Sequence, residues 1–438
     1  MDSSTASNST RQTTARRKST TVTLSNTGAP SAEEKTTERA IAPRTPPIPP
    51  PPELPEFRTR LKAEVWEEFL READCLEEFH DIPEGIKNGF KVGLEQYELT
   101  KTFIPNNHYT LPHHAEHVRI KRDEEIQIGR ISRGYTPSEL EQLIGYFRTA
   151  PLSVIEKPGK LRTIINHSYP DKAKGIDPAI TVSDTSERIP LDPSTTSINT
   201  AMKSKKWECN WGTFAECYLL VGGAPEGTEA AVFDVESAFR NIPIHPSAWP
   251  FLAMMIDDLI HIDLYSNFGA SASPGLWGRV ADAMARILKS KGVQALIKWV
   301  DDFIFFRYPK RRELNDTEPK FTYDASLIWS TANSLGWPWA IKKFIDFSQS
   351  FKYIGFDWSI SERTVQLPAE KKAKYLVKLQ SWMEGSKHSK DEVESIIGMS
   401  TTEQDTRSNR HRDTEPCHPS RTTRTQSTGP PLQVQRRL

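Results

Sequence analysis

Two adjacent aspartates, Asp301 and Asp302, interrupt an otherwise apolar stretch of this 438-residue chain, Ile297–Arg307. The flanking residues are rich in Ile, Val, Phe and Trp, which predicts two strands with the aspartates at or near the turn between them. Such a hairpin lies largely in a core, where an unpaired carboxylate is costly. A divalent cation such as Mg²⁺, which prefers carboxylate oxygens, would offset that cost. An ordinary Asp-rich turn explains this stretch alone equally well, because Asp favours turns.

Asp234 is a third carboxylate of interest, because the strand predicted at 230–233 stops on it. If that strand lies beside the 297–307 hairpin, three carboxylates converge on one edge. Two metal ions held about 4 Å apart by such groups activate a displacement at phosphorus. A second acidic pair, at 257–258, also separates two apolar runs, and the local pattern does not distinguish it from the pair in the hairpin.

A basic turn is predicted between two further apolar runs, Leu152–Ile155 and Leu161–Ile165. It contains Lys157, Lys160 and Arg162, which could neutralise the remaining oxygens of a phosphoryl substrate, with Arg suited to bidentate contact. Taken alone, the turn is more typical of a solvated basic loop.

Hydrophobic periodicity predicts the elements that must position these groups. The predicted helices are 60–82, 136–147, 213–220, 276–289, 323–335 and 370–383, followed by a capping-box start at 389–392. The predicted strands and hairpins are 230–234, 251–265, 342–347 and 351–358, and a Gly/Ser/Pro loop covers 268–275.

The two ends of the chain differ in composition from its middle. Hydrophobic residues make up 37% of the whole, which is below the usual share for a compact fold, and the deficit is concentrated at the ends. Residues 1–40 lack an apolar face and are predicted to be disordered. The Pro-rich segment 42–55 is predicted to be a stiff polyproline II spacer, with a ligand for a proline-recognising domain as the alternative. Because the formal net charge is zero, any nucleic-acid surface must be a local patch.

The cysteines and the hydropathy indicate the compartment. Cys75, Cys209, Cys217 and Cys417 form no CxxC pair and no His/Cys ligand cluster, which favours free thiols in a reducing compartment. No apolar run approaches transmembrane length, and the polar N-terminus lacks the apolar region of a signal peptide. We expect a soluble intracellular protein, cytoplasmic, nuclear or both.

The motifs, taken in order, resemble the fingers, palm and thumb of a reverse transcriptase. The match runs through LSVIEKPGKLRTIINHSYP, FDVESAFRNIPI, NFGASASPGLWGRVADAM, IKWVDDFIFF, WAIKKF and FKYIGFDW, and it covers roughly residues 60–398. Each motif is weak alone, but six in the right order form a specific pattern. The GRVAD and KWVDD segments are most similar to those of fungal DIRS-like or related retroelements.

This resemblance implies an α+β right-hand polymerase fold with a small antiparallel palm sheet backed by helices. It implies RNA-directed DNA synthesis, in which a primer 3′-hydroxyl attacks the α-phosphate of a dNTP. Asp234 and Asp301 match the aspartates that bind two Mg²⁺ ions, with Mn²⁺ as a substitute, and Asp302 matches their acidic neighbour. The implied partners are an RNA template, a DNA or RNA primer and dNTPs, with no membrane.

The resemblance also assigns residues around the incoming nucleotide. Phe239, five residues after Asp234, matches the aromatic gate that collides with a ribose 2′-hydroxyl. Phe268 and Gly269, with Ser273–Gly275, match the loop beneath the nucleotide and the template base.

Cationic residues are assigned in the same way. Lys160 or Lys157, together with Arg162, matches the fingers cations that contact the triphosphate. Lys342 or Lys343 matches a late palm lysine suspected of protonating pyrophosphate.

Some features depart from the family pattern or leave the function open. In the family pattern, Tyr or Phe usually precedes the metal-binding pair, and here that residue is Trp299. The segment 351–358 follows the family pattern and matches the hairpin that grips the primer end. The Gln/Arg/Thr/Pro-rich sequence after Met399 is typical of a shifted reading frame. One alternative is therefore a catalytically inactive or domesticated nucleic-acid-binding palm. A two-metal phosphodiesterase is another, although it gives no role to the basic turn or to Phe239.

The resemblance also divides the chain into segments. We predict a disordered tail at 1–56, an N-terminal helical extension at 57–149, fingers and the start of the palm at 150–230, palm at 231–360, a partial thumb at 361–399 and a disordered polar tail at 400–438.

Overall fold

The computed structural model describes residues 53–170, 188–202, 207, 209–311, 319–384, 388–394 and 396. They belong to one unit of the chain, which begins at Pro52. The predictions for the terminal segments 1–52 and 400–438 lie outside the described residues. None of the helices among the described residues is long and apolar enough to cross a membrane.

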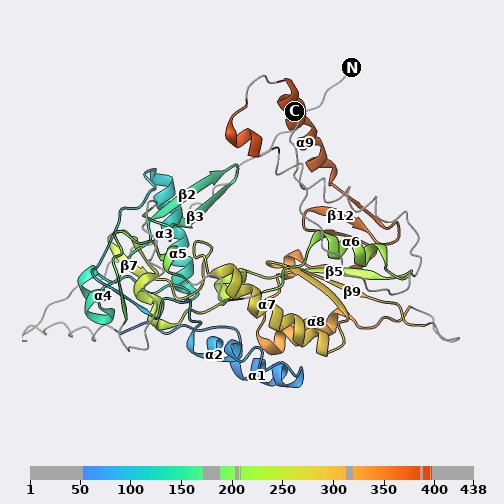
Figure 1. Ribbon diagram of the computed structural model, residues 1–438, viewed down its shortest axis with the longest axis horizontal. Coiled ribbons are helices and arrows are strands. Elements are labelled where there is room, and N and C mark those ends of the chain that lie inside the picture. Colours follow the sequence, from blue (N-terminus) through green and yellow to red (C-terminus); the bar gives the residue numbers. More distant parts are fainter. Residues whose placement is uncertain are drawn as a thin grey trace, which may run out of the picture. The chain divides into compact units, whose positions relative to one another are not determined.

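This unit contains a four-stranded antiparallel sheet with strand order β10-β5-β9-β8, and Figure 1 shows two of its strands, β5 and β9, side by side. Its strands are β5 (Glu229–Asp234), β8 (Ala295–Trp299), β9 (Asp302–Arg307) and β10 (Ile345–Ser348). The two central strands, β5 and β9, are buried along nearly their whole length. Their continuous apolar sequence follows from this burial, because a strand covered on both faces does not alternate apolar and polar residues.

Side chains that alternate along β5 and β9 enter two different cores. Phe233 and Phe303 belong to the large core, which includes side chains of α7 (Ser273–Ser290) and α8 (Ala325–Leu335). Val232 and Ile304 belong to a smaller core on the opposite face. That core contains residues of α6 (Phe214–Gly222) and of the sheet formed by β11 (Ser350–Tyr353), β12 (Phe356–Ser359) and β13 (Thr364–Gln366).

Two hairpins and one helix share a third, small core. The hairpins are β2 (Leu152–Lys157) with β3 (Lys160–Ile165) and β6 (Ala253–Ile256) with β7 (Leu259–Ile262), and the helix is α3 (Pro112–Gln127). Val118 of α3 packs in this core with Leu152 and Met254. Because these contacts lie near its base, the β2–β3 hairpin is anchored there, and its turn is exposed.

The remaining elements complete the unit. They are α1 (Ala63–Glu72), α2 (Asp81–Asn88), β1 (Tyr97–Leu99), α4 (Pro137–Ile144), β4 (Ile189–Leu191), α5 (Ile198–Ala201), η2 (Ala238–Asn241), η3 (Pro246–Phe251), η4 (Ile341–Lys343) and α9 (Ala369–Glu384). The predicted α+β class, with a small antiparallel sheet backed by helices, is confirmed.

Several predicted boundaries were wrong for local reasons. The helix predicted over 60–82 ends at Glu72, and Asp74 then adopts a positive φ of 51°, which a continuing helix cannot contain. Helix α7 begins at Ser273, three residues earlier than predicted, since Pro274 fits the first turn of a helix. The strand predicted at 342–347 begins only at Ile345, after a 3₁₀ turn.

Helix α3 was not predicted at all. Its sequence, PHHAEHVRIKRDEEIQ, buries only His114 and Val118. A helix that buries so few residues shows no apolar stripe, so the periodic signal is missing.

Candidate active site

The three carboxylates predicted to act together are brought to one end of two neighbouring strands. Asp234, the last residue of β5, lies directly opposite Asp302, the first residue of β9. Residues opposite each other in an antiparallel pair point to the same face, and like charges there destabilise the sheet. The site is therefore short of positive charge unless a cation joins it.

The turn that holds Asp301 is strained and is fixed by two hydrogen bonds. Val300, a β-branched residue, has a φ of 52°, which is unusual for its type. The indole Nε1 of Trp277 in α7 donates to the Val300 carbonyl at 2.7 Å, and the Val235 amide donates to the Asp301 carbonyl at 2.9 Å. Packing of α7 beneath the sheet thus sets the position of Asp301.

Burial and mutual repulsion perturb these carboxyl groups. Burial, followed by the charges of Asp301 and Asp234, raises the pKa of Asp302 to about 6. Burial, together with the charge of Asp234, also raises the pKa of Asp301. Asp234 is buried and accepts hydrogen bonds from Lys343 Nζ on both oxygens, at 2.8 and 2.7 Å. Its hydrogen bond to Asp234 in turn raises the pKa of Lys343.

The donor set of this cluster fits Mg²⁺ or Mn²⁺. Hard divalent cations take carboxylate oxygens, and three carboxylates face one ammonium group here. The oxygens of the three aspartates do not all lie within 4.8 Å of one another. Among the described residues, one group of three or more His, Cys, Asp and Glu side chains brings its ligand atoms within that distance, and it lies elsewhere.

A groove of about 730 Å³ connects the basic hairpin with this carboxylate edge. Five of the residues predicted to bind substrate or metal line it: Lys160, Arg162, Phe268, Gly269 and Asp301. The loop after Phe268 closely approaches strand β3, because a Cβ added to Gly269 would collide with the carbonyl oxygen of Ile165. Glycine at 269 thus lets the loop and the hairpin form adjacent walls of the groove.

Phe239 and Phe268 form one aromatic pair next to the groove. Their ring centroids are 4.7 Å apart. Phe239, predicted as the gate, is only 6% exposed, whereas Phe268 is 74% exposed and lies over it. Phe268 is therefore the aromatic surface that faces solvent, and Phe239 supports it from below.

Other predicted site residues lie apart from the groove or in different elements. Lys157 is exposed at the hairpin turn and does not line the groove. Both candidate lysines are exposed, and Lys343 is the one whose ammonium group contacts Asp234. Ser273, with the two residues after it, lies in the first turn of α7 rather than in the preceding loop, which corrects the predicted loop boundary.

The acidic pair at 257–258 occupies the turn between β6 and β7. Asp257 forms ion pairs with Arg119 and Arg122 of α3, at 3.0 and 2.9 Å. It thus ties a helix to a hairpin and takes no part in the 234/301/302 cluster.

The residue after Phe239 belongs to a buried polar network that the sequence pattern did not predict. Arg240, the residue after Phe239, donates to Asp263 and to Glu125, each at 2.6 Å. Asn267 donates to Asp263 at 2.9 Å and to Nε2 of His167 at 3.2 Å. This network joins η2 to α3 and to the residues that follow β3 and β7. The only sequence signal for this network was an Arg directly after Phe239.

Comparisons with known proteins give fold-level similarity only. No protein family model and no curated protein sequence matches the chain. Among solved structures, it is similar to the foamy viral protease–reverse transcriptase in complex with an RNA/DNA hybrid, with 13% identity and a TM-score of 0.47. Two further structures of that viral protein, with double-stranded DNA, give 14% identity and TM-scores of 0.47 and 0.44.

Each of these matches covers 79% of this chain but only 41%, 53% and 63% of the viral chains. At such identities and TM-scores, the function has to follow from the residues of the chain itself.

Proposed function

We propose that this chain is an RNA-directed DNA polymerase, a reverse transcriptase that transfers a nucleotide from a dNTP to a primer 3′-hydroxyl. The observation that supports this most is the groove that joins Lys160 and Arg162 of one hairpin to Asp301 of another. A triphosphate placed along it would meet guanidinium and ammonium groups at one end and carboxylates at the other.

Asp234 and Asp301, with Asp302 beside them, would hold the divalent metal ions. When bound, Mg²⁺ or Mn²⁺ would neutralise the developing charge on the transferred phosphoryl group. Lys160 and Arg162 would orient the triphosphate, and Phe268 would contact the nucleotide from the side supported by Phe239. Such positioning and charge stabilisation account for most of the catalysis in phosphoryl transfer.

The finer assignments belong to the same proposal. The β2–β3 hairpin would be part of the fingers, the four-stranded sheet the palm, and helix α9 part of the thumb. The partners would be an RNA template, a DNA or RNA primer and dNTPs. A fungal DIRS-like origin stays a prediction, since neither sequence comparison gives a match.

Primer extension by the purified full chain tests the proposal. We expect extension of a DNA primer on an RNA template with dNTPs and Mg²⁺ or Mn²⁺. The Asp301→Asn variant serves as the inactive control. A chain that binds the primer–template duplex but never extends it would instead be a nucleic-acid-binding domain, and the polymerase proposal would be wrong.

A further inference from the structure

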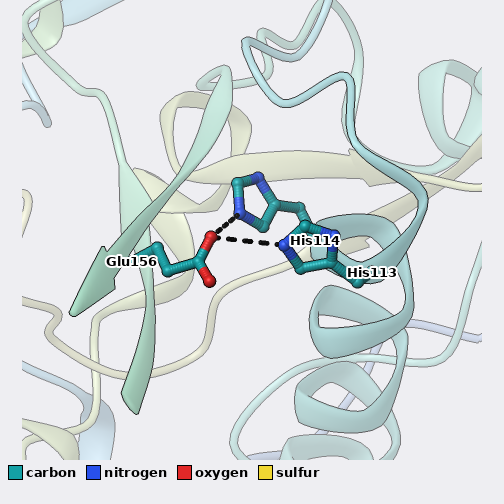
Figure 2. Close-up of side chains that lie close together, drawn as sticks. All are labelled: His113, His114 and Glu156. Atoms are coloured by element: carbon teal, nitrogen blue, oxygen red, sulfur yellow. Dashed lines mark hydrogen bonds and ion pairs between the residues drawn. The ribbon is translucent and has the colours of Figure 1, made fainter. Parts of the chain in front are cut away.

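A second group of ligand-type side chains lies on the β2–β3 hairpin, away from the aspartates. His113 and His114 are in the first turn of α3, and Glu156 is in β2 next to the hairpin turn. Figure 2 shows the Glu156 carboxylate facing both imidazole rings. One carboxylate oxygen lies 3.3 Å from Nε2 of His113 and 3.4 Å from Nε2 of His114.

These distances match one face of a metal coordination tetrahedron. With metal–nitrogen and metal–oxygen bonds of 2.0–2.1 Å, two ligands of a tetrahedral zinc ion lie about 3.3 Å apart. In the part of the chain that the structure describes, this is the one group of three or more His, Cys, Asp and Glu side chains whose ligand atoms all lie within 4.8 Å. Both histidines offer their Nε2 atoms to the same carboxylate oxygen, so the three ligand atoms converge.

We propose that His113, His114 and Glu156 form a zinc site, with a fourth position open to water. Two imidazoles and one carboxylate suit a borderline ion such as Zn²⁺, whereas Mg²⁺ prefers oxygen ligands alone. The site is thus chemically distinct from the aspartate cluster.

The first turn of a helix carries partial positive charge, which opposes a cation. At an exposed helix end that effect is small compared with zinc coordination by neutral imidazoles. The same partial charge favours the Glu156 carboxylate at this place. The balance therefore allows zinc to bind.

Zinc here would clamp the hairpin to α3 near its turn. Glu156 pairs with Leu161 across the hairpin, and Leu161 is the residue directly after Lys160. Without metal, Glu156 contacts the exposed His113 and the largely buried His114, and because its own carboxylate is 60% exposed, such ion pairs contribute little. With metal, the hairpin end that carries Lys160 would be fixed relative to α3, and thus to the groove.

Metal binding by the full chain tests the site independently of polymerase activity. The variants are His113→Asn and Glu156→Gln, because these side chains are 53% and 60% exposed and their exchange should not affect folding. The control is His80→Asn, which changes an exposed histidine outside the cluster whose ring hydrogen-bonds to the carbonyl of Glu77. Circular dichroism would verify that the folds match.

We expect wild type and the His80 control to bind one more zinc ion per chain than either variant. Removing a ligand should weaken zinc binding by about a hundredfold or more, because even groups that only hydrogen-bond to a ligand change affinity about 10–100-fold. Cobalt should give a visible spectrum that zinc abolishes in wild type and that both variants lack. Equal zinc stoichiometry and affinity in wild type and both variants would overturn the proposal.

Hydrogen exchange tests the clamp itself. Zinc should slow amide exchange over 152–165 in wild type and in His80→Asn, but not in Glu156→Gln. If zinc protects this hairpin equally in Glu156→Gln, or does not protect it in wild type, the clamp does not exist.

Discussion

Lys343 donates a hydrogen bond to each carboxylate oxygen of Asp234, at 2.8 and 2.7 Å, and so occupies the place that a metal ion would need. The two residues are 109 positions apart in sequence. A cation that binds Asp234 competes with this ammonium group, and a displaced ammonium group would be free to serve the reaction.

Lys343→Met should separate these two roles. Loss of the competing ammonium should lower the Mg²⁺ concentration needed for half-maximal extension. Loss of a proton donor to pyrophosphate should lower the maximum rate by about a hundredfold or more. Mg²⁺ titrations of single-nucleotide incorporation measure both effects, and the exposed neighbour Lys342→Met is the matched control. A Lys343 variant with an unchanged Mg²⁺ requirement and rate would remove this residue from the site.

Asp301→Asn should abolish incorporation without unfolding the chain. The loss of a metal ligand removes charge stabilisation, on the order of a thousandfold or more in rate. Burial and the charge of Asp234 raise the pKa of Asp301, so its ionised form is unfavourable in the folded state. The variant should therefore unfold at the same temperature as wild type or higher.

Asp258→Asn is the better control for that experiment than Asp257→Asn. Asp257 is tied to Arg119 and Arg122 of α3, so its exchange also loosens a hairpin. Single-turnover rates of wild type, Asp301→Asn and Asp258→Asn test the assignment of Asp301 to the metal site. The assignment would be wrong if Asp258 were essential and Asp301 dispensable.

Phe239→Val should raise ribonucleotide use relative to deoxynucleotide use. If Phe239 is the proposed gate, the smaller side chain makes room for a 2′-hydroxyl that the ring would exclude. Because the rings of Phe268 and Phe239 pack with their centroids 4.7 Å apart, the Phe268 ring should also move toward residue 239 in the variant. The measurement is kcat/KM for matched ribo- and deoxynucleotides on one primer–template. Phe268→Ala, which removes the exposed ring, serves for comparison: if it alone changes the ratio, Phe268 is the gate.

The hydrophobic pattern predicted the local elements, whereas the pairing of Asp234 with Asp302 was only a conditional expectation and the other long-range contacts were not predicted. Both Asp-containing hairpins were found because apolar runs and turn residues are contiguous, and Asp257 and Asp258 adopt the positive φ values that such a turn requires. The Lys343–Asp234 pair and the convergence of His113 with Glu156, 43 residues away, leave no mark on periodicity. Long-range polar contacts depend on how elements pack, which the hydrophobic pattern does not encode.

His167 should make the stability of the chain depend on pH. Burial, followed by repulsion from Arg148, lowers the pKa of His167 from 6.5 to about 3. Below about pH 6.5, His167 therefore becomes protonated in the unfolded chain but stays neutral in the folded chain. The free energy of unfolding falls as the pH falls. The loss from this residue should reach about 2 to 3 kcal/mol between about pH 7 and pH 4.5.

The variant His167→Gln keeps an acceptor for the amide of Asn267 but cannot take up a proton in this range. Urea unfolding of wild type and variant at matched pH values isolates the contribution of His167, because His261 and the other histidines titrate in both proteins. The variant should be less stable than wild type near pH 7, because a flexible Gln side chain fills the place of a buried imidazole ring less well, yet it should lose less stability on acidification. Parallel stability curves for the two proteins between about pH 7 and pH 4.5 would mean that His167 is protonated as readily in the folded chain as in the unfolded one.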